Sequence, residues 1–237
     1  MAGKVKRPDG RKIEEMRPIS AKVGVVPNAD GSAIFEFGKT KAIAAVYGPK
    51  QMHPQHSQNP KKGTLRFTYN MLSFSVHDRI RPGPSRRSTE ISNISGWALD
   101  PVVDLSKYPS MVVDVHVNIL QADASTRCAG INAAALALAH AGIPMKDLVS
   151  SLSIGKLDKQ LVVDVDKEEE DWEEGEGATD IAVSYTGEGE LTHIQLDGHI
   201  NKEELKEALE MGKKAAKEIY EVQKKALKDS VNIGGKK

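Results

Sequence analysis

The sequence is poor in cysteine, in aromatic residues and in net charge. Cys128 is the only cysteine among 237 residues, which excludes an intrachain disulfide and a cysteine-based zinc cage. A lone thiol is typical of a reducing compartment, so we expect a cytoplasmic protein. The 33 basic and 33 acidic side chains cancel, which argues against a generally polybasic nucleic-acid binder. Any polyanion must therefore be held by a local group of basic residues.

Long apolar runs are absent as well. The longest apolar stretch, residues 133–141, is too short and too small-sided to span a membrane. The basic segment 1–11 lacks the apolar core of a signal peptide. We therefore expect no membrane association. The first dozen residues carry many charges and are expected to be mobile.

Hydrophobic periodicity predicts both strands and helices in the first half of the chain. Residues 21–47 alternate between apolar and polar side chains around two turns, which predicts an antiparallel meander. A strand over residues 64–72, a helix that begins near Ser85 and a strand over residues 111–120 then indicate a βαβ unit. The first half is therefore expected to be of the α+β class.

A domain boundary is expected near residues 143–147, just after a helix of small residues. Beyond it, Asn201 with Glu204 three residues later predicts the capped start of a long amphipathic helix. The predicted strands of this second half cover residues 152–157, 161–165, 181–185 and 191–196. The chain thus divides into two α+β halves.

The segment Ser125-Thr126-Arg127 connects the strand over residues 111–120 to the small-residue helix over residues 130–141. Free N–H groups and the positive end of the helix dipole would meet two hydroxyls and a guanidinium at this point. Such an arrangement suits a phosphate. The alternative is an ordinary Ser/Thr N-cap, followed by an arginine in a surface ion pair.

Two cations, Arg86 and Arg87, open the helix that begins near Ser85. Positive charge at a helix N-terminus opposes the macrodipole and costs about 0.3–1 kcal/mol per residue unless something compensates it. A bound polyanion would compensate it, whereas the alternative is a solvated basic turn. Trp97, in the same helix, is expected to pack against its neighbours.

Carboxylates are concentrated in residues 167–179, an acidic run that is followed directly by Asp180. Such runs are usually solvated. Asp180 differs because it immediately precedes an apolar strand. A side chain held at the mouth of a strand is a candidate acid or metal ligand.

These features occur together in motifs that resemble the RNase PH family of 3′→5′ exoribonucleases, most closely the catalytic subunits of the archaeal exosome. The matching segments, in chain order, are RPDGR (7–11), MRPI (16–19), ADGSA (29–33), AAVYGP (44–49), YNM (69–71), RPGPSRRS (81–88) and LQADASTRCAGINAAALALAHAGIPMKDLV (120–149). Several long motifs in one order are far more specific than any single motif, and the similarity extends over nearly the whole chain.

The resemblance implies an RNase PH fold of the ribosomal-protein S5 domain-2-like class, with two βαβ-type halves. Its N-terminal domain would span residues 10–145 and its C-terminal domain residues 148–228. It also implies a hexameric ring, in which this chain alternates with a related non-catalytic subunit, three of each. A cap of RNA-binding proteins would cover the ring.

The implied activity is processive 3′→5′ phosphorolysis of single-stranded RNA. Inorganic phosphate would be the co-substrate, Mg²⁺ the expected cofactor and nucleoside diphosphates the products. One alternative is a structural ring subunit that binds RNA without catalysis, but the presence of Arg127 and Asp180 favours the catalytic role. Another alternative is a plain RNA-binding scaffold, which would show no dependence on phosphate.

The matched motifs also imply roles for individual basic and hydroxyl residues. Ser125, Thr126 and Arg127 match the phosphate-binding loop of the family. Arg86 and Arg87 match a basic pair that holds the RNA backbone near the scissile phosphate. The family usually has glycine where this chain has Ser125, so the backbone is expected to approach phosphate differently here.

The resemblance also implies roles for the acidic residues and for the residues that would face the pore. Asp180 would protonate the leaving 3′-oxygen or hold the metal ion, and Lys61 and Lys62 would track phosphates in the pore. The first acidic residue of the site has two candidates. The Glu-Glu-Asp sequence of the family motif matches Asp171, whereas the family's usual spacing from Asp180 indicates Glu174. The match in sequence favours Asp171.

Overall fold

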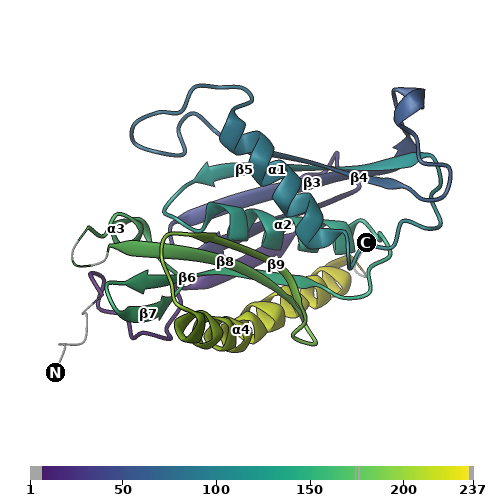
Figure 1. Cartoon of the computed structure of the whole chain (residues 1–237). Helices are drawn as coiled ribbons and strands as arrows, with labels where there is room; N and C mark the ends of the chain where they lie inside the picture. The colour runs from purple at the N-terminus through teal and green to yellow at the C-terminus, as the bar shows by residue number, and fades with distance from the viewer. Residues whose placement is uncertain (1–6, 174, 176, 235–237) are drawn as a thin grey trace.

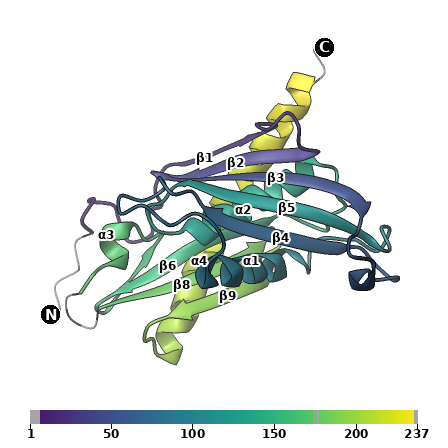
Figure 2. The ribbon, with the colours of Figure 1, turned by 90° about the horizontal axis from the view of Figure 1, so that it is seen from above.

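The computed structural model describes residues 7–173, 175 and 177–234. Two β-sheets pack against one buried helix, α2 (Thr126–His140), as Figures 1 and 2 show. Each sheet comes from one half of the chain. A long helix, α4 (Lys202–Gly234), packs mainly against the second sheet and also contacts the edge of the first. The α2 helix therefore forms a core that both halves share.

The first sheet has five strands in the order β1-β2-β3-β5-β4. They are β1 (Ile19–Val23), β2 (Gly31–Phe37), β3 (Thr40–Gln51), β4 (Thr64–Met71) and β5 (Met111–Gln121), with a short 3₁₀ turn (Gln55–Ser57) between β3 and β4. The first three strands pair antiparallel with their sequence neighbours, which confirms the predicted meander. β4 and β5 are parallel and are connected through α1 (Arg86–Leu99), which confirms the predicted βαβ unit.

The second sheet has four strands in the order β7-β6-β8-β9. They are β6 (Val149–Leu157), β7 (Gln160–Val163), β8 (Ala178–Thr186) and β9 (Leu191–Asp197), and a one-turn helix, α3 (Lys167–Glu170), lies between β7 and β8. Its strand pairings are all antiparallel. The α+β class is confirmed, and the parallel βαβ connection belongs to the first half.

The α2 helix is buried because its side chains are small and mostly apolar. Residues 128–138 are all buried. Small side chains let a backbone come very close, so an ideal Cβ on Gly31 of β2 would lie 2.3 Å from the carbonyl oxygen of Ala137. On the other side of the helix, the amide of Asn132 bonds the backbone N–H and carbonyl of Ser151 in β6, at 2.8 and 2.7 Å. The helix is thus fixed to both sheets.

The start of α4 agrees with the sequence prediction. The side chain of Asn201 accepts hydrogen bonds from the N–H groups of Glu203 and Glu204 at 3.0 and 2.9 Å. The carboxylate of Glu204 accepts one from the N–H of Asn201 at 3.0 Å, which completes the capping box. Ala208 and Ile219, on the apolar face, are fully buried.

Two expectations about single residues are wrong. Arg7 is only 2% exposed, so the described part of the N-terminal segment is anchored rather than mobile. Trp97 is 70% exposed and does not pack in its helix. Because α1 buries Ile91 and Ser95, and Trp97 follows Ser95 by about 200° of helical rotation, its indole lies on the outer side.

Among the described residues, no helix combines the length and hydrophobicity that a bilayer crossing requires.

Gly31→Ala is expected to destabilise the protein. The added methyl would lie 2.3 Å from the carbonyl oxygen of Ala137 and 2.4 Å from the backbone nitrogen of Ala141, and neither atom can rotate away. Overpacking typically costs about 1–3 kcal/mol, so the free energy of unfolding in urea should fall by at least that amount.

Gly96→Ala is the matched control for this substitution. The new Cβ would meet the Cβ of Phe67 in β4 at 3.6 Å, an ordinary van der Waals contact between α1 and the first sheet. Alanine is also the better helix former, so stability should stay the same or rise by about 0.5–1 kcal/mol. Equal losses for the two variants would contradict the close approach of β2 and α2.

Candidate active site

A cavity of about 700 Å³ opens where the two halves of the chain meet. Its wall combines the loop after β4, the start of α1, the loop between β5 and α2, α3 and β8. Arg87, Thr126 and Arg127 supply hydrogen-bond donors to this wall, and Glu170 and Asp180 supply carboxylates. Four of these five residues were predicted from the sequence, and Glu170 was not.

The loop that leads into α2 has an unusual backbone. Ala124 and Ser125 have φ values of 54° and 52°, in the left-handed region that favours glycine. Ser125 occupies the N-cap position of α2, but its side chain makes no capping hydrogen bond, so the alternative of an ordinary Ser/Thr side-chain cap does not hold. The N–H groups at the start of α2 are not engaged by a capping side chain, which suits an anion.

The hydroxyl of Ser125 is turned into the protein. Its Oγ accepts from Nη2 of Arg17 at 3.1 Å and lies 2.7 Å from the Oγ of Ser153 and 3.1 Å from the carbonyl oxygen of Val165. A hydroxyl with these partners is already engaged. The phosphate-binding role predicted for Ser125 would therefore fall to its backbone. The left-handed φ of Ser125, 52°, explains why glycine also suits this position.

A buried ion pair between Arg17 and Asp164 holds this loop in place. Nε and Nη2 of Arg17 donate to the two carboxylate oxygens of Asp164 at 2.9 and 2.6 Å. The backbone N–H of Arg17 also donates to Asp164, at 2.8 Å, and Nη1 donates to the carbonyl oxygen of Asp123. The side chains are 6% and 0% exposed. One arginine thus joins the N-terminal segment, the loop before α2 and the segment after β7.

The electrostatics of Arg17 are consistent with this role. Burial alone would lower the pKa of Arg17, but the hydrogen bonds and negative charge of Asp164 hold it above its usual value. A buried arginine stays charged when a carboxylate meets it in two hydrogen bonds. We refer to Arg17, Asp164 and Ser125 together as the loop clasp.

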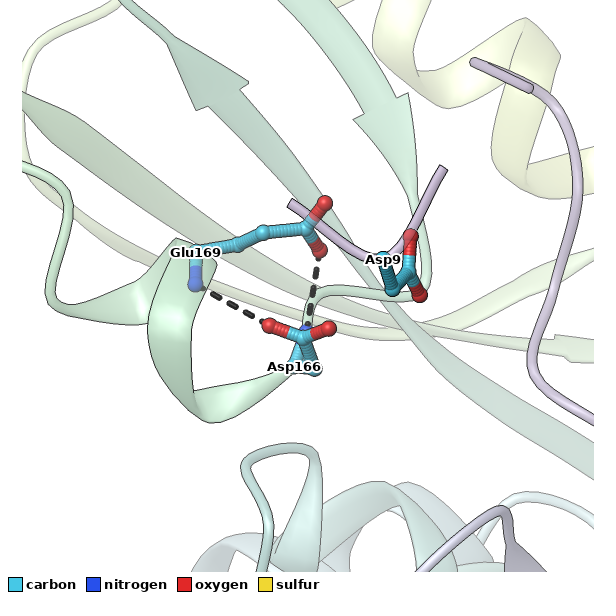
Figure 3. A group of neighbouring side chains, drawn as sticks. All are labelled: Asp9, Asp166 and Glu169. Carbon is cyan, nitrogen blue, oxygen red and sulfur yellow. Dashed lines mark hydrogen bonds between the residues drawn. The ribbon is translucent and has the colours of Figure 1, made fainter. Parts of the chain in front are cut away.

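A second buried group of ion pairs positions α3. Nε and Nη2 of Arg7 donate to the carboxylate of Glu169 at 2.6 and 2.8 Å, with both side chains almost fully buried. Glu169 and Asp166 form a capping box at the start of α3, as the dashed bonds in Figure 3 show. Because Glu169 is locked in this way, the adjacent Glu170 is held at the cavity wall.

The same group contains three neighbouring carboxylates that resemble a metal site. One carboxylate oxygen from each of Asp9, Asp166 and Glu169 lies within 4.8 Å of the others (Figure 3). Arg7 and Arg11 are already paired with them: Nη2 of Arg11 lies 3.3 Å from Asp166 and 3.4 Å from Glu169. The two guanidinium groups therefore already supply positive charge to these carboxylates, and a metal ion is not needed for that purpose.

Asp180 lies within β8 rather than before it, which corrects the sequence expectation. It pairs with Gly155 of β6 on one side and Asp197 of β9 on the other. Burial raises the pKa of Asp180 from 3.8 to about 6; the positive charge of Arg127 opposes this shift and the carboxylate of Glu170 adds to it. A carboxyl group with this pKa can hold a proton near neutral pH and release it to a substrate.

Arg127 is oriented by a neutral side chain. Its Nη1 donates to Oε1 of Gln195 in β9, and Nε2 of Gln195 donates to Glu90 of α1 at 3.0 Å. Nearby, burial and the charge of Arg127 lower the pKa of His193 to about 4, which keeps this imidazole uncharged at neutral pH. The alternative of an arginine engaged in a surface ion pair is not what the described contacts show. Its positive charge remains directed at the cavity.

The other predicted site residues lie apart from the cavity. Arg86 is exposed and does not line it. Lys61 and Lys62 precede β4, whose opposite end reaches the cavity, and Lys62 lies 3.8 Å from Asp100. Asp171 pairs with Lys167 at 2.6 Å, is 62% exposed in its side chain and does not line the cavity.

Glu174, the alternative to Asp171, lies outside the described residues. Among the described carboxylates of the acidic run, Glu170 is the one that lines the cavity together with Asp180. No local pattern in the acidic run distinguishes Glu170 from its neighbours. What distinguishes it is the burial of the adjacent Glu169, which points a different face of α3 into the protein.

The comparisons with known proteins agree with this geometry. The family model described as "3′ exoribonuclease family, domain 1" (RNase PH) matches residues 15–144, and its domain 2 matches residues 147–215. The chain belongs to the RNase PH family. The protein named exosome complex component Rrp41 in Thermococcus kodakarensis is 50% identical over 211 residues, which cover 89% of this chain and 84% of the relative. Its namesake in Pyrococcus furiosus is also 50% identical, covering 89% and 83%.

Solved structures show the same RNase PH fold. Rice Rrp46 superposes with a TM-score of 0.81 at 24% identity, covering 92% of this chain and 98% of the other. A chain of the Archaeoglobus fulgidus exosome with RNA bound to the active site gives 0.79 at 22% identity, covering 91% and 92%. The expected fold family is therefore confirmed.

Asp164→Asn is expected to destabilise the protein strongly, because it removes the charge that balances the buried Arg17. Breaking a buried pair by changing one partner typically costs about 3–5 kcal/mol. Urea denaturation of the full chain at neutral pH measures the change.

Glu221→Gln serves as the control, since it breaks the exposed pair with Lys224, whose N–O distance is 3.2 Å. Such surface pairs contribute roughly 0–1 kcal/mol. A loss for Asp164→Asn no larger than that of the control would refute the importance of the loop clasp.

Asp180→Asn is expected to stabilise the protein at neutral pH. The native pKa is raised from 3.8 to about 6, so wild-type stability should fall as pH rises through this interval and level off above it. The asparagine variant lacks this fall and should gain up to about 3 kcal/mol above pH 6, with little gain below pH 4. Unfolding measured across pH 3.5–8 would reveal it.

Asp229→Asn on the exposed side of α4 provides the matched substitution. It should leave the shape of the stability curve between pH 4 and pH 6 unchanged. If Asp180→Asn follows the wild-type curve at every pH, Asp180 is not held in an unfavourable charged state.

Proposed function

We propose that this chain is the catalytic subunit of an archaeal-type exosome. It degrades single-stranded RNA processively from the 3′ end, with inorganic phosphate as the attacking group. The observation that carries the proposal is the cavity in which the open start of α2, Arg127 and Arg87 face Asp180, whose pKa is raised to about 6. Anion-binding groups and a protonatable acid on one wall suit a reaction between two phosphates.

The chemistry assigns a distinct task to each side. An oxygen of inorganic phosphate attacks the terminal phosphodiester, a new P–O bond forms, and the bond to the 3′-oxygen of the preceding nucleotide breaks. Arg127 and the N–H groups at the start of α2 would hold the attacking phosphate, and Arg87 the scissile one, which reduces repulsion between the two anions. Asp180 would give its proton to the leaving 3′-oxygen, and the product is a nucleoside diphosphate.

A divalent cation fits the carboxylate side of the cavity. Asp180 and Glu170 both line it and offer the oxygen ligands that Mg²⁺ prefers. When bound, the ion would neutralise negative charge on the phosphates. Asp180 can fill only one of these two roles at a time, because a protonated carboxyl group does not bind a metal ion, and its raised pKa favours the role of proton donor.

Relatives named as exosome components support an assembly with other RNase PH-type subunits. We expect a hexameric ring with three copies of a related non-catalytic chain and RNA-binding cap proteins. Leu191, Ile194 and Leu196 on β9, an edge strand, are 40–44% exposed, which suits a subunit contact. Lys61 and Lys62 would then track RNA phosphates outside the cavity. A cytoplasmic location remains our expectation.

The assembled complex is expected to release nucleoside diphosphates only when phosphate is present. This chain, co-expressed with a related RNase PH-type subunit of the same organism, would be incubated with end-labelled RNA and Mg²⁺. Asp180→Asn should lower the rate by about 10²–10⁴-fold, because a positioned acid contributes that much. Chromatography of the products distinguishes diphosphates from monophosphates.

Asp229→Asn, an equivalent change on the surface of α4, should leave the rate unchanged. Comparing Glu170→Gln with Asp171→Asn in the same assay identifies the second carboxylate, and the cavity geometry favours a larger loss for Glu170→Gln. Monophosphates formed without added phosphate would mean hydrolysis. RNA bound without shortening would support the structural-subunit alternative.

A further inference from the structure

Phe74 is the most exposed large apolar side chain among the described residues. Its exposed fraction is 74%, and it lies on the loop between β4 and α1, where it lines the cavity. A phenylalanine in this position leaves most of its apolar surface in water, which is unfavourable. The ring thus offers a free face at the edge of the candidate active site.

The backbone that carries Phe74 is fixed on both sides. Before it, the N–H of Leu72 donates to the carbonyl oxygen of Ile119 at 3.1 Å. After it, the carbonyl oxygen of Ser75 accepts from the N–H of Ala122 at 2.9 Å, and Ser75 is 3% exposed. Ala122 lies two residues before the left-handed loop at Ala124. The exposed ring is therefore held at a set distance from the phosphate loop.

Ser75 provides a second observation at the same place. Its Oγ is buried and has no hydrogen-bond partner among the described residues, and the residue lines the cavity beside Phe74. A buried hydroxyl without a partner is unfavourable, and a polar group of a ligand would relieve this. An exposed aromatic ring next to an unsatisfied hydroxyl suits a ligand with both a flat apolar face and oxygen atoms.

The charges of the cavity narrow the class of ligand. Arg87 and Arg127 line the same wall, so an anionic ligand is favoured over an apolar one. Aromatic rings combined with arginines are the usual means of binding single-stranded nucleic acid, because any base can stack on the ring while its phosphate meets the cation. A nucleotide satisfies all three features.

We propose that Phe74 and Ser75 form a nucleotide subsite, in which Phe74 stacks on a base at the 3′ end of the RNA and Ser75 bonds its sugar or phosphate. This inference rests on the proposed function, since it names the part of the site that takes the base. It explains how RNA is retained near the scissile bond without reading its sequence, because stacking accepts every base.

The test measures RNA affinity with and without the base. In the assembled complex carrying Asp180→Asn, which slows degradation, and without added phosphate, the Kd for fluorescent oligoadenylate is measured by anisotropy at fixed salt. Phe74→Leu keeps an apolar side chain but removes the π face, and should raise Kd roughly 5- to 100-fold. Phe74→Trp should retain the affinity. RNA with abasic 3′-terminal positions should bind wild-type Phe74 and Phe74→Leu equally.

Two further variants sharpen the result. Ser75→Ala should weaken intact and abasic RNA by the same factor, because its hydroxyl meets sugar or phosphate. Trp97→Leu removes an aromatic ring that is 70% exposed but does not line the cavity, and it should leave the base-dependent part of the affinity unchanged.

Several outcomes would overturn the proposal. Equal Kd for Phe74 and Phe74→Leu on intact RNA would do so, as would an equal loss on abasic RNA. If Phe74→Leu disrupts the complex on size-exclusion chromatography, the ring belongs to a protein interface instead. Failure of the parent complex to bind any RNA would refute the proposed function itself, whereas RNA binding without dependence on Phe74 refutes only the subsite.

Discussion

The ion pair between Arg17 and Asp164 is the interaction on which the geometry of the candidate site depends. Both side chains are almost fully buried, so each is tolerated only because the other is present. The same guanidinium also reaches Asp123 and Ser125, whose segment turns through two left-handed residues into α2. A strained backbone of this kind persists only where its surroundings fix it. The shape of the loop before α2 is therefore set by a charge from the other half of the chain.

Much of the fold was predictable because it follows from local patterns. Alternation predicted the meander, the run of small residues predicted a helix where α2 lies, and Asn201 with Glu204 predicted the start of α4. Arg17 had no such signal, since it finds Asp164 at a separation of 147 residues. Glu170 was missed because the side that a residue of α3 faces is set by the burial of its neighbour. Arg127 and Asp180 were predicted from their places before a helix and beside an apolar strand, the family resemblance then implied their roles, and both line the cavity.

The basic and acidic side chains of the site face each other across the cavity, but the positive charge of the basic groups is not cancelled there. Arg127 is held by the neutral amide of Gln195, which orients the guanidinium and leaves its charge available. Asp180 is partly buried beside Glu170, which favours its protonated form. By contrast, Arg7 and Arg17 are fully matched by carboxylates. Positive charge is thus balanced where it supports the fold and left unbalanced where it faces the cavity.

The burial of α2 between the two sheets has a consequence for how the chain folds and evolves. The family models divide the chain into two sequence domains. The helix α2, near the end of the first domain, is nevertheless bonded to the sheet of the second through Asn132 and Ser151. Separating the halves would expose the apolar surface of α2 in the first half and the surface of the second sheet that packs against it. We therefore expect the two halves to unfold together as one cooperative unit, and an exchange of either half by recombination to need a counterpart that matches α2.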